Sequence, residues 1–214
     1  MPLYPINLNI RSQRCAVLGG GRVATRKVAA LLAAEAAVTV ISPQLTRTLA
    51  ELVANRRIVY WDRPYRTGDL AGFWLVICAT GDPAVNRAAA REVITGGGLV
   101  NVADDPAAGN FSVPAQVQRG DLLFTVSTGG KSPALARELR RELAARYGPE
   151  YARYLESVAK LRGELKTDQA SPARRCRFWR RAIDDEVLIL LRQGELAKAE
   201  ARIKDAVDSN RSEP

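Results

Sequence analysis

A glycine turn between an apolar stretch and a helix-forming stretch carries the clearest chemical signal of this sequence. The stretch Cys15–Leu18 is apolar, and Gly19, Gly21 and Ala24 follow it in the pattern G-x-G-x-x-A. In this pattern the first glycine permits a tight turn, the second lets the backbone approach a pyrophosphate, and the third position lets the helix pack close to the strand. The helix N-terminus also offers free N–H groups to phosphates. The turn therefore predicts a dinucleotide site.

Two adjacent carboxylates are the second candidate for chemistry. Asp104 and Asp105 follow the predicted strand Leu99–Val102, and open α/β sheets bind ligands at the carboxyl ends of their strands. The chain has no histidine, so acid–base work falls to Asp, Glu, Lys, Tyr or Cys. A carboxylate beside a nicotinamide can act as a base. An ordinary Asp-rich turn before Pro106 explains the same residues equally well.

A polar glycine loop before a later predicted helix is the third candidate. Thr128, Gly129, Gly130 and Lys131 lead into Ser132, which is typical of a helix N-cap. A helix N-terminus at this point can hold the carboxylates of a substrate. Simple capping of the helix is the alternative, because capping needs no ligand.

Further cofactor contacts are expected where the second and fourth predicted strands end. An acidic residue usually binds the ribose about 20 residues past the glycines, and it is missing here. The hydroxyl of Ser42 can bind the ribose instead, so the choice between NAD and NADP stays open. Asp82, before Pro83, is typical of a turn or a helix cap. The predicted cofactor-binding residues are Gly19, Gly20, Gly21, Arg22, Val23, Ala24, Ser42, Pro43, Gln44 and Thr80.

Alternating strands and helices predict how these residues are positioned. Apolar strands alternate with helical segments over the first half of the chain, which is typical of a parallel, doubly wound α/β sheet with right-handed crossovers. The predicted strands are 15–18, 38–41, 58–61, 74–79 and 99–102, and the predicted helices are 23–34, 43–55 (with Pro43 at its start) and 83–96.

The pattern changes after the fifth strand. Strand-like segments at 111–114 and 122–127 precede a helix over 133–147 that carries Leu135, Leu139 and Leu143 on one face, which suggests an oligomerisation element. We expect three regions: 1–112 for the nucleotide-binding domain, 113–147 for the dimerisation region and 148–214 for a helical C-terminal region. In the last region the predicted helices are 151–165, 178–191 and 195–207.

Composition limits the class of protein. The chain has 214 residues, 47% of them hydrophobic, which is enough for a buried core. No apolar run reaches the ~20 residues of a membrane span, and residues 1–10 lack the features of a signal peptide. Three distant cysteines, Cys15, Cys78 and Cys176, favour reduced thiols and a cytoplasmic protein.

The net charge of +9 favours acidic partners. The charge is spread along the chain, so nucleic acid is not the expected partner. One basic cluster lies beside Phe178 and Trp179, and it either grips an acidic partner or forms a solvated face. Its members are Arg174, Arg175, Arg177, Arg180 and Arg181.

Three motifs in this order resemble the precorrin-2 dehydrogenase family, the dehydrogenase part of siroheme synthases. They are Gly19–Lys27, Asn101–Asp104 and Ser127–Arg137, and the segments Tyr4–Ile6 and Arg177–Trp179 also fit. The resemblance covers nearly the whole chain. Three ordered motifs are far more specific than one glycine turn.

The resemblance implies oxidation of precorrin-2 to sirohydrochlorin in siroheme biosynthesis, with NAD as acceptor. It also implies a homodimer built from a Rossmann-type parallel-sheet domain, a small α+β dimerisation region and a helical C-terminal region. The catalytic residue of the family falls on Asp104, and the tetrapyrrole carboxylates are expected at Thr128, Gly129, Gly130 and Lys131. Some members insert Fe²⁺ as well. Fused members carry a methyltransferase domain after the dehydrogenase part, and we do not expect one within these 214 residues.

The chain shows no Cys/His cluster for a resident metal, but transient chelation needs no permanent site, so iron insertion stays open. The alternative from another class is an NAD-sensing regulator that signals through its basic helical tail. A third option, another small NAD-dependent dehydrogenase, is weaker because the Tyr-x-x-x-Lys pair of one large class is absent.

Overall fold

The chain consists of two compact units, and each is described by itself. The computed structural model describes residues 3–167, 178–179 and 183–212. The first unit is Met1–Val113 and the second is Pro114–Pro214. The arginine cluster at 174–181 and Cys176 lie outside the described residues.

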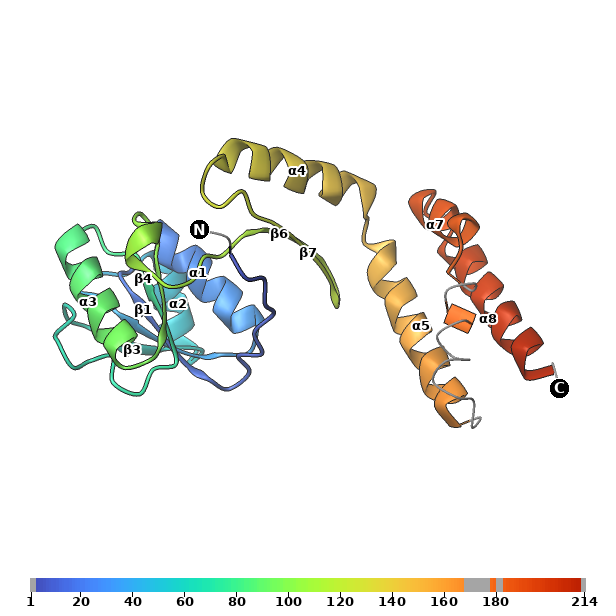
Figure 1. The fold of residues 1–214 in the computed structure, drawn as a ribbon. Helices are drawn as coiled ribbons and strands as arrows, with labels where there is room; N and C mark the ends of the chain where they lie inside the picture. The colour runs from blue at the N-terminus through green and yellow to red at the C-terminus, as the bar shows by residue number, and fades with distance from the viewer. Residues whose placement is uncertain (1–2, 168–177, 180–182, 213–214) are drawn as a thin grey trace. The chain divides into compact units, whose positions relative to one another are not determined.

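A five-stranded parallel sheet forms the centre of the first unit (Figure 1). The strand order is β3-β2-β1-β4-β5, and every pair is parallel. The chain starts in the middle, moves out to one edge and returns to build the other half. The prediction of a doubly wound sheet is confirmed. The strands are β1 (Arg14–Leu18), β2 (Ala37–Ile41), β3 (Val59–Trp61), β4 (Leu75–Cys78) and β5 (Leu99–Val102).

Both faces of this sheet are buried. On one face, Cys15 and Val17 of β1 join a core cluster with residues of α1 (Arg22–Ala33) and α2 (Arg47–Ala54). On the other face, Ala16 and Leu18 join a cluster with α3 (Pro83–Thr95). Because successive strand residues point to opposite faces, a strand covered on both sides reads as a continuous apolar run.

Helix α2 starts later than predicted. It begins at Arg47, with Thr46 as its N-cap, and not at Pro43. The hydroxyl of Thr46 accepts a hydrogen bond from the backbone N–H of Leu49 at 3.4 Å. The hydroxyl of Ser42 donates to the backbone oxygen of Gln44 at 2.8 Å, which holds residues 42–45 as a loop. A side chain that bonds its own backbone competes in this way with helix formation.

The strand predicted at 111–114 is also misplaced. Strand β6 (Ala115–Arg119) begins at Ala115, while residues 111–114 form no strand. Phe111 packs instead against the core of the first unit. Its backbone oxygen accepts a hydrogen bond from the side-chain Nδ2 of Asn101 at 3.1 Å. Phe111 therefore belongs to the core of the first unit and not to the hairpin.

The second unit begins with a hairpin and continues as helices. Strands β6 and β7 (Leu122–Val126) pair antiparallel, and Gly120 takes a φ of +57° in the turn between them. A further core cluster joins Tyr154 of α5, Leu191 of α7 and Ile203 of α8. The helices are α4 (Pro133–Arg146), α5 (Glu150–Thr167), α7 (Asp185–Arg192) and α8 (Leu196–Ser212).

One expectation for this unit needs correction. The helix predicted over 178–191 is interrupted, because Ile183 and Asp184 are not helical and α7 starts at Asp185. The carboxylate of Asp184 accepts a hydrogen bond from the N–H of Val187 at 3.0 Å and caps α7. On α4, Ala136 is the buried residue, whereas Leu135 is 52% exposed. Leu139 is exposed too.

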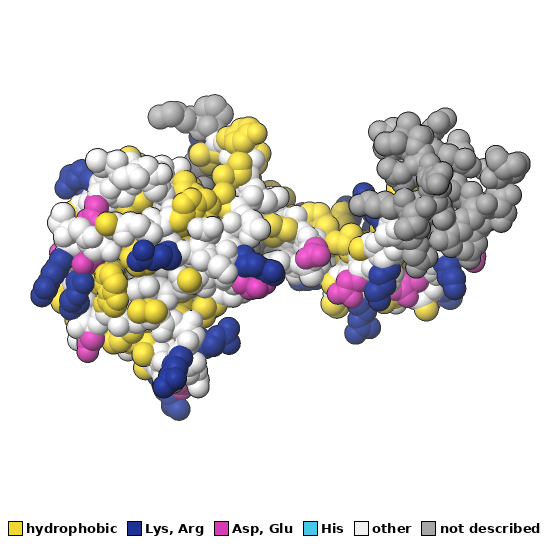
Figure 2. Space-filling view, turned by 90° about the horizontal axis from the view of Figure 1, so that it is seen from below, with side chains coloured by type: hydrophobic (Ala, Val, Ile, Leu, Met, Phe, Trp, Pro, Cys, Tyr) yellow, Lys and Arg dark blue, Asp and Glu magenta, His cyan; other side chains and the backbone are white. Residues whose placement is uncertain are grey.

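No helix among the described residues combines the length and the apolar character that crossing a membrane requires. Figure 2 shows Lys and Arg side chains scattered over the visible face of the first unit, without one dense stripe. This agrees with the expectation of a spread charge.

Candidate functional site

A cavity of about 530 Å³ lies at the carboxyl ends of β1, β2 and β4. This is the edge at which doubly wound sheets bind their ligands. Seven of the ten predicted cofactor residues line it, namely Gly19, Gly20, Gly21, Ser42, Pro43, Gln44 and Thr80. Arg22, Val23 and Ala24 do not line it, because they form the first turn of α1 behind the glycines.

The glycine turn is shaped by two different constraints. Gly19 has a φ of +102°, which glycine alone adopts readily. A Cβ atom on Gly19 would lie 2.4 Å from the carbonyl oxygen of Ala79, so the turn packs directly on the end of β4. A Cβ atom on Gly21 would meet nothing within 4 Å. Gly19 thus lets the turn pack against the end of β4, whereas Gly21 faces open space where a pyrophosphate would fit.

Gly20 is constrained although the dinucleotide pattern leaves its position free. A Cβ atom there would lie 1.9 Å from the carbonyl oxygen of Gln44. The backbone oxygen of Gly20 also accepts a hydrogen bond from the N–H of Thr46 at 2.9 Å. The hydroxyls of Thr46 and Thr25 are 2.8 Å apart and hydrogen-bonded, which ties α1 to the loop after β2.

The N-terminus of α1 is suited to an anion. Its N-cap is Gly21, so no side chain caps the first turn, and no acidic residue stands there. Ala24 is fully buried, which allows close packing of helix and sheet. The free N–H groups and the helix dipole favour a negatively charged group at this end. The open space at Gly21 and the uncapped turn together fit a dinucleotide pyrophosphate.

The loop after β2 forms one wall of the cavity, and the Ser42 hydroxyl in this loop is already hydrogen-bonded. Ser42 is buried, and its hydroxyl donates to the oxygen of Gln44 and accepts from the N–H of Gln44 at 3.4 Å. The ribose contact predicted for Ser42 therefore competes with these bonds, and that contact stays a prediction.

Asn86 connects the cavity to the predicted catalytic aspartate. This side chain is fully buried on α3. Its Oδ1 accepts a hydrogen bond from the Thr80 hydroxyl at 2.7 Å, and its Nδ2 donates to Asp104 Oδ1 at 3.3 Å. Asp104 does not line the cavity itself, but Asn86 joins it to the Thr80 rim.

The two adjacent carboxylates have different partners. Asp105 forms an ion pair with Arg87, with Nε and Oδ2 3.0 Å apart. Asp104 is exposed just after β5. Burial, and to a smaller extent the charge of Asp104, raises the pKa of the Cys78 thiol to about 12. Asp105 is thereby bound to α3, and Asp104 is the carboxylate that remains accessible.

Other polar and ionisable groups at this edge are structural. Asp82 caps α3 as predicted, because its carboxylate accepts from the N–H groups of Ala84 and Val85. Burial raises the pKa of Cys15 to about 11, so both buried thiols are protonated at neutral pH. Among the described residues, no group of three or more Cys, Asp or Glu side chains could hold a metal ion.

Comparison with known proteins places the chain in a family. The NAD(P)-binding family profile matches residues 6–115, the profile of the sirohaem biosynthesis protein central region matches 119–146, and that of the sirohaem synthase dimerisation region matches 150–207. The chain belongs to the NAD(P)-binding family that the first of these profiles describes, and its second unit matches two sirohaem-biosynthesis regions. The prediction that its first unit binds NAD(P) is confirmed.

Relatives and a solved structure agree with this assignment. The chain is 34% identical over 207 residues to the siroheme synthase of Chromobacterium violaceum and 36% identical over 209 residues to that of Methylococcus capsulatus. These matches cover 97% and 98% of this chain and 44% of each relative. The chain thus spans less than half the length of these relatives.

The solved structure of SirC, precorrin-2 dehydrogenase, is similar along its full length. The TM-score is 0.77 at 28% identity, covering 94% of this chain and 100% of that chain.

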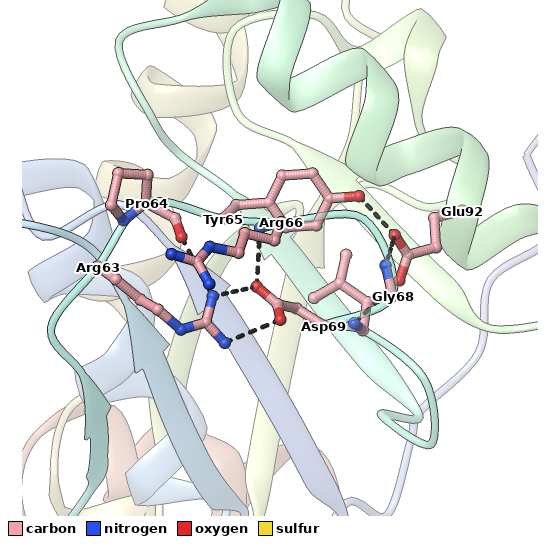
Figure 3. A network of polar contacts seen from close by, with 8 residues as sticks. Arg63, Pro64, Tyr65, Arg66, Gly68, Asp69 and Glu92 are labelled. Atoms are coloured by element: carbon pink, nitrogen blue, oxygen red, sulfur yellow. Dashed lines mark hydrogen bonds and ion pairs between the residues drawn. The ribbon is translucent and has the colours of Figure 1, made fainter.

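The sequence prediction missed the loop after β3. Pro64 and Tyr65 line the cavity, and a hydrogen bond from the Tyr65 hydroxyl to Glu92, 27 residues further along the chain, holds Tyr65 there (Figure 3). Asn86 was missed as well. A polar residue on the otherwise apolar buried face of α3 was the available signal for it, whereas no motif marks Pro64 and Tyr65.

The Thr128–Lys131 loop lies in the second unit of this family member. Gly129 and Gly130 have φ values of +61° and +80°, and Cβ atoms on either would meet nothing within 4 Å. The Thr128 hydroxyl accepts from the N–H of Ser132 at 3.1 Å, and Ser132 caps α4. The predicted N-cap is confirmed, and a substrate role of the loop stays a prediction.

Proposed function

We propose that this chain oxidises precorrin-2 to sirohydrochlorin with NAD as the acceptor, in siroheme biosynthesis. One observation carries the proposal: an open glycine cradle lies at the same sheet edge as an accessible carboxylate, Asp104, which buried Asn86 joins to Thr80 at the rim of the cavity. The likeness to SirC, precorrin-2 dehydrogenase, supports the choice of substrate.

The cofactor would be held mainly by backbone groups. The N–H groups at the start of α1 would bind the pyrophosphate above Gly21, and residues 42–44 and Thr80 would line the rest of the site. When bound, NAD supplies the acceptor for a hydride. The chain contributes orientation and exclusion of water.

Asp104 is proposed as the general base. Loss of a hydride and a proton from the substrate needs a proton acceptor, and this chain has no histidine. The Nδ2 of Asn86 donates to one oxygen of Asp104 and leaves the other free to take a proton. The ion pair with Arg87 makes Asp105 a poor second choice.

The substrate contacts are proposed at Thr128, Gly129, Gly130 and Lys131. Precorrin-2 carries many carboxylates, which suit a basic protein. Because the side chain of Ser132 already caps α4, the exposed ammonium of Lys131 would supply most of the attraction. The loop glycines leave open space for the substrate to approach.

A homodimer is proposed from the second unit. Residues 150–207 of this unit match the profile of a dimerisation region. Leu123, Leu135 and Leu139 are 39%, 52% and 37% exposed in the single chain, and a partner chain would cover such apolar side chains. Sedimentation velocity tests this proposal, and a monomer at micromolar concentration would contradict it.

An anaerobic assay tests the activity. Purified protein, precorrin-2 generated in the cuvette and NAD should give NADH together with the sirohydrochlorin spectrum. Asp104→Asn should lower kcat at least 100-fold with NAD affinity unchanged, whereas the matched variant Asp105→Asn should retain most activity. NAD binding without turnover would overturn the dehydrogenase proposal and favour the regulator.

Iron insertion is tested in the same cuvette. Fe²⁺ is treated as a second substrate, and Asp104 is the group that could accept the pyrrole protons. Conversion of the sirohydrochlorin spectrum to that of siroheme, at a rate above the protein-free control, would extend the proposal to chelation. The cytoplasmic location stays a prediction.

A further inference from the structure

The loop after β3 forms a wall of the cofactor cavity that no motif predicts. Pro64 and Tyr65 line the cavity together with the loop after β2. The two loops start side by side, because the N–H of Ser42 donates to the oxygen of Trp61 at 3.2 Å. Tyr65 is half-buried and also packs against the second core cluster.

Topology decides which half of a dinucleotide this wall would contact. In doubly wound sheets the pyrophosphate lies over the β1–α1 turn, and the residue after the second strand binds the adenosine ribose. The strand order here places β3 outside β2, on the far side from β1. Residues after β3 therefore lie on the adenosine side of the site.

The position of the Tyr65 ring is fixed through α3. The Tyr65 hydroxyl donates to Glu92 Oε2 at 2.5 Å, as Figure 3 shows. Glu92 also accepts from the N–H groups of Gly68 and Leu70, each at 2.9 Å. One carboxylate on α3 thus fastens the loop at three points. Burial and the Glu92 carboxylate raise the pKa of Tyr65 to about 12, so the donor stays protonated.

A second clamp holds the start of the loop. Arg63 binds the carboxylate of Asp69 through both of its terminal nitrogens, at 2.6 and 2.8 Å. Asp69 also accepts from the N–H of Arg66 at 2.8 Å. With the ends of the loop fixed by Arg63 and Glu92, the Pro64–Tyr65 pair is preformed.

We propose that Tyr65 is the adenine platform of the NAD site, and that Glu92 is its positioning residue. The inference rests on the proposed use of NAD and adds the residue that recognises the adenine ring. An aromatic face beside a cavity can stack on a base without selecting a hydrogen-bond pattern. The preformed loop lowers the ordering cost of binding.

Binding of NAD and of its two halves to the full chain tests the platform. Titration calorimetry gives the affinity for NAD, and ligand-observed NMR compares AMP with nicotinamide mononucleotide. Tyr65→Ala should lower the affinity for NAD and AMP about tenfold and leave nicotinamide mononucleotide unchanged. Tyr65→Phe keeps the ring and should lose no more than about threefold. Tyr60→Phe is the matched control, since the Tyr60 hydroxyl bonds Asp62 outside the cavity.

A double-mutant cycle tests Glu92. Glu92→Gln should weaken NAD and AMP binding about threefold and raise KM for NAD, with kcat at saturating NAD unchanged. Combined with Tyr65→Phe, the losses should be clearly less than additive, because both variants break the same bond. Glu51→Gln, which removes only an exposed ion pair with Arg47, is the control.

The outcomes separate this inference from the proposed function. Failure of the unmodified chain to bind NAD would overturn both. Tight NAD binding that Tyr65→Ala leaves unchanged, or that falls equally for AMP and nicotinamide mononucleotide, would overturn the platform alone. Strictly additive losses for Glu92→Gln and Tyr65→Phe would overturn the positioning role of Glu92.

Discussion

The chain has two glycine loops that lead into helices, and they treat the helix N-terminus in opposite ways. In the first unit, α1 starts at Gly21 without a side-chain cap, so its N–H groups are left for a ligand. In the second unit, the Ser132 hydroxyl caps α4 and Thr128 accepts from Ser132. Two loops of similar composition thus differ in function. The Gly21 turn leaves its N–H groups for an anion, whereas side chains of the Thr128–Ser132 loop bond some of that loop's own N–H groups.

The largest effect should come from placing a charge in the open turn. Gly21→Asp puts a carboxylate where the pyrophosphate would lie, and NAD affinity should fall about 1,000-fold, about 4 kcal/mol. Titration calorimetry measures the loss. Gly163→Asp, at an exposed helical glycine that also faces open space, should bind NAD normally. If Gly21→Asp bound NAD as tightly as the unmodified chain does, the pyrophosphate site would not lie at this turn.

Stability should distinguish the two loops next. Gly19→Ala forces a side chain into a φ of +102° and against Ala79, and we expect about 3 kcal/mol of destabilisation. Gly129→Ala has the same chemistry but open space at a φ of +61°, so about 1 kcal/mol is expected. Urea unfolding compares them, and equal losses would contradict the packed turn at Gly19.

Removing the cap should affect only the second loop. Ser132→Ala should cost about 1 kcal/mol of stability, because it frees the N–H of Leu135. NAD affinity should not change, since Ser132 belongs to the second unit. Thermal unfolding together with NAD titration checks both points, and weakened NAD binding would indicate that the cap serves the cofactor.

The substrate role of the second loop should be a smaller, selective effect. Lys131→Gln should raise KM for precorrin-2 about threefold, as expected for one exposed charge, with NAD affinity unchanged. The effect should shrink as salt is added, because exposed charges are screened. An unchanged KM at low salt would leave the loop with its capping role alone.

The smallest effect concerns pH and the loop clamped by Arg63. The Arg63 guanidinium, with the Arg66 N–H, lowers the pKa of Asp69 below its ordinary value. A lowered folded-state pKa adds stability above the unfolded pKa, and this contribution disappears as pH falls through the folded one. The stability of the unmodified chain should therefore fall modestly as the pH drops through the lowered pKa of Asp69. In Asp69→Asn this fall should be absent. The glycine turn has no ionisable group and should keep its form in acid.

Sequence alone predicted the parts of this site that are local. The glycine turn is a contiguous motif, and Asp82 and Ser132 cap helices that begin at the next residue. The parallel, doubly wound sheet followed from the alternation of strands and helices. The Pro43 start of α2 was wrong because a single bond from Ser42 to Gln44 decides that loop.

Long-range contacts were beyond the sequence. Tyr65 and Glu92 are 27 residues apart, and only the packing of α3 beside the loop brings them together. The same holds for Asn86 and Asp104, which the fold places within one hydrogen bond. The leucine face of α4 was different, because its pattern alone suggested an oligomerisation element and Leu135 is 52% exposed in the single chain.

The close packing of Gly20 limits how this protein can change over evolution. The dinucleotide pattern tolerates any residue at that position, yet here a backbone oxygen of the loop after β2 occupies the space of a Cβ atom. A descendant with a larger residue at position 20 must first shift or shorten residues 42–46. Substitution at position 20 and length changes in that loop should therefore occur together.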